Sequence, residues 1–142
     1  MTPARGALSR ATAFLRSGSG GPFPPRVAAN MLHELDRLLH ALLDEGGARP
    51  GQRHTANKLG SRASAGDGAR LVALHRSAAC LKHRDGRAAR PDERGGRAMT
   101  LGWPDRPDGA LRVVTLGEPV SPSRADLLDV CAFYDRLAAA LP

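Results

Sequence analysis

The segment from Arg26 to Glu45 constrains the fold of this chain most, because its apolar residues recur every three or four positions. They are Val27, Met31, Leu32, Leu35, Leu38, Leu39, Leu42 and Leu43. This is the period of an α-helix with one apolar face, and Gly46 with Gly47 marks its end. The segment therefore predicts a helix packed within a domain, and a chain of 142 residues has room for one such domain.

Two further helices are predicted downstream. The first runs from Ala69 to His83, with Asp67 as N-cap, and carries the apolar residues Leu71, Val72, Leu74, Ala78, Cys80 and Leu81. In the last helix Ser123 is the cap, and Asp126, three residues later, closes a capping box. Its predicted buried face consists of Leu127, Val130, Cys131, Tyr134, Leu137 and Leu141.

Two short runs between these helices alternate as β-strands do. In residues 98–103 the alternating side chains are Met99, Leu101 and Trp103, and in residues 110–117 they are Leu111, Val113 and Thr115. The residues between the two runs include two prolines and an Asp-Gly pair, which favour a turn. The arginine-rich stretch from Arg84 to Arg97 has little to bury and is predicted to be an exposed loop. The predicted fold is mainly α (α+β): a helical bundle-like domain with one β-hairpin, at about residues 97–117, inserted before the C-terminal helix.

The first 25 residues differ in composition from the rest. Ser17 to Pro25 is a linker rich in glycine and proline, and before it three arginines flank apolar residues at helical spacing without any acid. We expect residues 1–25 to form a flexible basic arm and residues 26–142 to form a single domain. The arm could be a helix that meets a partner or a membrane surface, a targeting presequence, or a first bundle helix.

The composition argues against several classes of protein. Cys80 and Cys131 lie far apart without a C-x-x-C pair, unlike the cysteines of a zinc ribbon, a redox site or a secreted disulfide scaffold. We expect two buried thiols in a cytoplasmic protein. No apolar run reaches the ~18 residues of a membrane span. The net charge of +7 comes from 19 arginines with only Lys58 and Lys82, a bias that fits the codon usage of a GC-rich genome better than a design for binding, so the charge is only weak support for an anionic partner.

One pair of side chains carries the signal for function. Arg76 and His83 are seven positions apart, so at about 100° per residue they return to nearly the same face of a helix. An arginine binds phosphate oxygens, and a histidine accepts or donates a proton near neutral pH. Together they suffice for metal-independent RNA cleavage, in which the 2′-hydroxyl attacks the adjacent phosphorus. We predict no metal and no cofactor.

The stretch from Arg76 to Gly86 resembles the Arg-x(4–6)-His signature of HEPN (higher eukaryote and prokaryote nucleotide-binding) domains, with a polar residue after the arginine and His83 before the glycine. In architecture the resemblance extends from Val27 to Leu141. It implies an endoribonuclease or RNA-binding protein of a toxin–antitoxin or defence system, a homodimer whose two Arg–His pairs line one cleft, with a cognate antitoxin or other protein partner. The predicted catalytic residues are Arg76 and His83, and the predicted substrate contacts are Ser77, Lys82, Arg84 and Arg87.

The same residues also allow interpretations in which the protein catalyses no reaction. Arg76 could pair with a carboxylate such as Asp85 or Asp129, and His83 could cap the end of its helix. The protein would then be a noncatalytic helical protein-interaction module. A third interpretation is a basic protein that binds nucleic acid through phosphate contacts alone, although 4% aromatic residues provide no row of rings for stacking bases.

Other histidines and Cys80 were weighed as site residues. Arg70 and His75 also match the signature, but a five-residue step places them about 140° apart on a helix. His33 and His40 share a helix face, yet no third ligand has matching spacing, so we expect two solvated surface histidines. Cys80 is three residues from His83 and could hydrogen-bond to it, but we expect it in the core.

Overall fold

The computed structural model describes residues 24–45, 64–106 and 109–139, together with the separate positions Gly6, Arg10 and Ala13. In these ranges the elements are α2 (Pro25–Glu45), α4 (Ala65–His83), β1 (Ala98–Pro104), β2 (Leu111–Thr115) and α5 (Arg124–Ala139). The predicted fold, mainly helical with one antiparallel hairpin before the last helix, is confirmed. Most of the predicted basic arm, and Leu141, lie outside the described residues.

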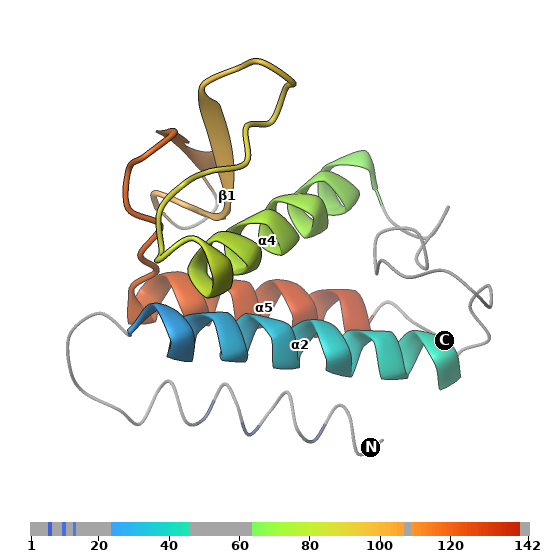
Figure 1. The fold of residues 1–142 in the computed structure, drawn as a ribbon. Helices are drawn as coiled ribbons and strands as arrows, with labels where there is room; N and C mark the ends of the chain where they lie inside the picture. Colours follow the sequence, from blue (N-terminus) through green and yellow to red (C-terminus); the bar gives the residue numbers. More distant parts are fainter. Residues whose placement is uncertain are drawn as a thin grey trace.

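The helices form two layers. α2 and α5 lie side by side, and α4 crosses over them (Figure 1). The leucine stripe of α2 faces this crossing, and Leu35, Leu39 and Leu43 are at most 1% exposed. Val27 belongs to the same stripe but is 44% exposed, because Ala28 and Ala29 face the core in the first turn of the helix. None of the described helices is long and apolar enough to cross a lipid bilayer.

α4 begins earlier than its sequence predicted. Ser64 is the N-cap, and its hydroxyl accepts the backbone N–H of Asp67 at 3.1 Å. Asp67 is therefore not the cap but lies in the first turn, where a carboxylate is favoured by the helix dipole. The predicted capping box of α5 is confirmed: the Ser123 N–H donates to Asp126 Oδ2 at 2.8 Å, and the Asp126 N–H donates to Ser123 Oγ at 3.1 Å.

The stretch after α4 is only partly the exposed loop that the sequence predicted. Arg87 forms an antiparallel bridge with Pro119. The Ala88 N–H donates to the Glu118 carbonyl at 2.8 Å, and Ala88 accepts the N–H of Gly117 at 2.8 Å. Ala88 is 3% exposed. Residues 86–88 are therefore fixed against the segment that follows β2.

The hairpin packs onto α4 through a close approach at Gly102. The Gly102 N–H donates to Ser77 Oγ at 3.2 Å, and a Cβ at Gly102 would lie 2.3 Å from Leu74 Cδ2. β1 and β2 pair from Ala98↔Thr115, with an irregularity before the last pair, Pro104↔Leu111. This packing places the hairpin at the end of the molecule where α4 ends and α5 begins (Figure 1).

Candidate functional site

The two predicted catalytic residues lie on the second half of α4. His83 is the last residue of the helix and is exposed, and its imidazole makes no hydrogen bond or ion pair with another described residue. Arg76 lies two turns earlier, and its Nη1 donates to Asp92 Oδ1 at 3.0 Å. Arg76 thus pairs with a carboxylate, as the noncatalytic interpretation supposed, but its partner is Asp92 rather than Asp85 or Asp129. The side chain of Arg76 remains 31% exposed.

Asp92 connects Arg76 to the hairpin. The Thr100 N–H donates to Asp92 Oδ1 at 2.8 Å, and the Thr100 hydroxyl donates to Oδ2 at 2.5 Å. Burial opposes the charged form of Asp92, but these two hydrogen bonds and the charge and hydrogen bond of Arg76 hold the pKa of Asp92 below its usual range. Arg76 is therefore held in place by an ionised carboxylate that is itself fixed to β1.

The predicted substrate contacts divide into two groups. Ser77 is fully buried, and its hydroxyl donates to the Ala73 carbonyl at 2.8 Å and accepts the N–H of Gly102. It joins α4 to β1, and its hydroxyl does not face a substrate. Lys82, Arg84 and Arg87 are exposed, and Arg87 Nη1 donates to the Gly117 carbonyl at 3.0 Å.

Further cations extend this surface beyond the predicted residues. The side chains of Arg90, Arg94 and Arg97 are exposed and, like those of Lys82 and Arg84, make no hydrogen bond or ion pair within the described ranges. We call the following set the basic loop: Lys82, Arg84, Arg87, Arg90, Arg94 and Arg97. The same stretch contains only three acids, one of which is engaged by Arg76. The result is a group of exposed positive charges on backbone that hydrogen bonds hold in place.

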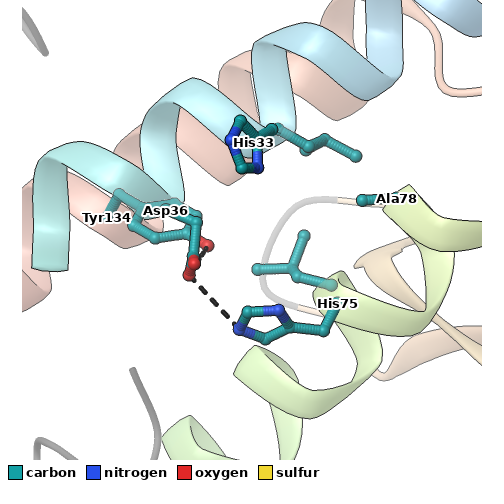
Figure 2. Close-up of a pocket in the computed structure, with 7 residues that line it drawn as sticks. His33, Asp36, His75, Ala78 and Tyr134 are labelled. Carbon is teal, nitrogen blue, oxygen red and sulfur yellow. Dashed lines mark hydrogen bonds and ion pairs between the residues drawn. The ribbon is translucent and has the colours of Figure 1, made fainter. Parts of the chain in front are cut away.

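A second cluster, which the sequence analysis did not single out as a site, surrounds Asp36 of α2. His75 of α4 places Nε2 at 3.3 Å from Asp36 Oδ1, and the Tyr134 hydroxyl of α5 donates to the same oxygen at 3.3 Å (Figure 2). His40 Nε2 lies 3.6 Å from Asp36 Oδ2. The cluster lines a pocket of about 50 Å³, which has space for a few water molecules and not for a nucleobase.

The environment of this cluster shifts the pKa values of two of its groups, His75 and Tyr134. The hydrogen bond and the charge of Asp36 outweigh burial and raise the pKa of His75 above its usual value. Burial, with help from Asp36, raises the pKa of Tyr134 well above 10. The expectation for His40 was wrong, because His40 is partly buried beside Asp36, whereas His33 is exposed as predicted. Within the described ranges, no group of three or more His, Cys, Asp or Glu side chains is placed to hold a metal ion.

The second Arg–His match does not form one site. Arg70 donates through Nε to the Gly102 carbonyl at 3.0 Å and through Nη2 to Asp129 at 2.5 Å, and it stacks over Phe133. His75 points instead to α2. The 140° separation expected for a five-residue step thus sends the two side chains to different neighbours.

Burial excludes Cys80 as a site residue, and it excludes the described Trp, Phe and Tyr rings as a stacking surface for bases. Cys80 is fully buried, and its Sγ lies 3.8 Å from Met99 Sδ, so it is a core residue as expected. Trp103, Phe133 and Tyr134 are at most 3% exposed. Among the described residues, therefore, no aromatic ring is available to stack on a base.

Comparisons with protein-family models, with curated proteins and with solved structures find no match to this chain. A fold of this type does not specify an activity, so the function has to be inferred from the chemistry of the side chains.

Proposed function

We propose that the protein binds RNA at the basic loop and cleaves it without a metal ion, as the resemblance to HEPN domains implies. The observation that carries the proposal is the position of Arg76 and His83. Two helical turns separate their Cα atoms by about 10 Å, a distance that the two side chains span toward one phosphate. The exposed cations of the basic loop begin beside His83 and continue along the chain.

The two side chains have separate roles in the proposed reaction. His83, in its neutral form, accepts the proton of the 2′-hydroxyl as that oxygen attacks the adjacent phosphorus. The bond from phosphorus to the 5′-oxygen breaks, and this oxygen leaves with a proton from water or from the imidazole of a second copy. Arg76 binds the phosphate oxygens on which charge develops. A homodimer that joins two Arg–His pairs in one cleft would supply both the base and the acid.

The proposed substrate contact is with the RNA backbone. Arginine and lysine side chains neutralise phosphates irrespective of sequence, and the described part of the chain offers no exposed ring to read or stack on a base. We therefore expect little sequence preference and a strong dependence on salt. Replacing Arg90 and Arg94 together with alanine should lower the slope of log Kd against log salt by about 1.4 for single-stranded RNA. Arg37→Ala, far along α2, is the matched control and should leave that slope unchanged.

The decisive experiment is an RNA-cleavage assay with purified full chain in excess EDTA. His83→Ala should abolish cleavage and leave RNA binding intact, whereas His33→Ala should change neither. Arg76→Lys keeps a cation beside Asp92 but removes the planar fork, so it should reduce the cleavage rate in a folded protein.

Cleavage that persists in His83→Ala would overturn the assignment of the base. Binding to RNA with salt dependence but without cleavage, with or without added metal, would reduce the function to phosphate binding. No binding even at low salt would refute the proposal and leave the noncatalytic interaction module as the better interpretation.

A further inference from the structure

A single carboxylate connects the three described helices. Asp36 of α2 accepts the hydroxyl of Tyr134 from α5 and faces His75 Nε2 of α4, each at 3.3 Å (Figure 2). The Nε2 of His40 lies 3.6 Å from the other carboxylate oxygen of Asp36. The side chain of Asp36 is 17% exposed and that of His75 is 33% exposed. The contact is thus partly shielded from solvent, and His75 is exposed enough to exchange a proton with it.

We propose that Asp36 and His75 form a pH-sensitive latch between α2 and α4, which is closed when His75 is protonated and loosened when it is neutral. In the closed form a charge-assisted hydrogen bond joins the two helices, and such a bond is about twice as strong as one between neutral groups. In the neutral form the contact persists only if the remaining proton is on Nε2. Tyr134 stays attached to Asp36 in both forms.

The charges around His75 determine the direction of this switch. From α2 it faces Asp36, and His33 lines the same pocket; from α5 it faces the neutral hydroxyl of Tyr134. His40 approaches the other oxygen of Asp36. Arg70 acts weakly on Tyr134 and is itself compensated by Asp129 of α5. The charge that acts on His75 at this contact is that of Asp36, and it favours protonated His75.

The sign of the pH effect follows from the pKa of His75, which is raised in the folded chain. The latch contributes its full stabilisation below the pKa of an unfolded histidine, about 6.5. That contribution is lost as the pH rises through the higher value of the folded state. α4 also carries Arg76 and His83, so the latch would loosen the helix that presents the proposed RNA site, although the latch does not depend on that function.

Histidine-selective NMR on the full chain tests the proposal, because the chain has five histidines and one tyrosine. The resonance of His75 should titrate with a midpoint above 6.5, and the ring resonances of Tyr134 should shift with the same midpoint. In Asp36→Asn the midpoint of His75 should fall and the Tyr134 shift should disappear. His33→Gln, the matched control, should leave both transitions unchanged.

His75→Gln and His40→Gln identify which imidazole operates the latch. The Tyr134 transition should be lost in His75→Gln and retained in His40→Gln. Failure of Asp36→Asn to fold would leave the wild-type titration and these two variants as the test. A Tyr134 transition that follows His40 or is absent, or a His75 midpoint at or below 6.5, would overturn the proposal. None of these readouts involves RNA, so the outcome is separate from that of the proposed function.

Discussion

Gly102 of β1 holds the hairpin against α4, and replacing it with alanine should destabilise the fold. The added Cβ would lie 2.3 Å from Leu74 Cδ2 and 2.9 Å from Leu74 Cα. Because the nearest backbone atom cannot rotate away, β1 and α4 must separate. Overpacking of this kind costs about 1–3 kcal/mol, and weakening the Ser77–Gly102 hydrogen bond adds about 1 kcal/mol. A smaller gain of about 0.4–1 kcal/mol from the stiffer unfolded chain opposes these terms. We expect a net loss of about 1–3.5 kcal/mol.

Urea denaturation followed by the fluorescence of Trp103, the single tryptophan, measures this loss at a fully buried reporter. Gly68→Ala is the matched control, because Gly68 lies in the first part of α4 and an added Cβ would meet nothing within 4 Å. There the same substitution should stabilise by about 0.5–1 kcal/mol, since alanine is the better helix former. A loss below about 0.5 kcal/mol for Gly102→Ala would refute the close approach of β1 and α4.

Two further predictions concern acid stability and assembly. The hydrogen bond from Arg136 holds the pKa of Asp67 below its usual range despite burial, and hydrogen bonds from Thr100 with the charge of Arg76 do the same for Asp92. The stabilisation from these two ionised carboxylates is present above about pH 4, the pKa of an aspartate in the unfolded chain, and is lost as the pH falls through their lower pKa values in the folded chain. The urea midpoint should therefore be lower at pH 3 than at pH 5, and Asp67→Asn should reduce that difference. We also expect a homodimer, so sedimentation at micromolar concentration should give twice the 15.0 kDa of one chain, and a single 15.0 kDa species would contradict the shared cleft.

The parts of the fold that local spacing determines were predictable. The leucine stripe of α2, the antiparallel hairpin and the Ser123–Asp126 capping box all depend on residues a few positions apart, and the structure has each of them. The alternation predicted for the second strand was wrong in phase: Val113 is 58% exposed, and Val114 and Leu116 pack against the core instead. The start of α4 was misplaced because Ser64 and Asp67 are both good caps, and only the geometry decides between them. The bridge between Arg87 and Pro119 depends on how the chain folds back after β2, which no local pattern reveals.

The candidate site was less predictable because its contacts join residues that are far apart in the sequence. Helical periodicity placed Arg76 and His83 on one face, but the partner of Arg76 arrives from the loop that returns to β1, not from a neighbouring turn of a helix. Ser77 has the polarity of a substrate contact, yet its neighbour in space is a strand backbone. For the Asp36 cluster the only local signal was the four-residue spacing of Asp36 and His40. The contacts with His75 and Tyr134 required the helix packing.

The ion pair of Arg76 does not compete with its proposed role in binding phosphate. A guanidinium has five N–H donors, and Asp92 accepts one of them. Asp92 also receives two hydrogen bonds from Thr100, one at each carboxylate oxygen, so it is not left without partners when Arg76 moves toward an anion. The carboxylate of Asp92, which is 31% exposed, therefore keeps hydrogen-bond partners on the β1 side. We therefore expect the pairing with Asp92 to be compatible with the phosphate binding proposed for Arg76.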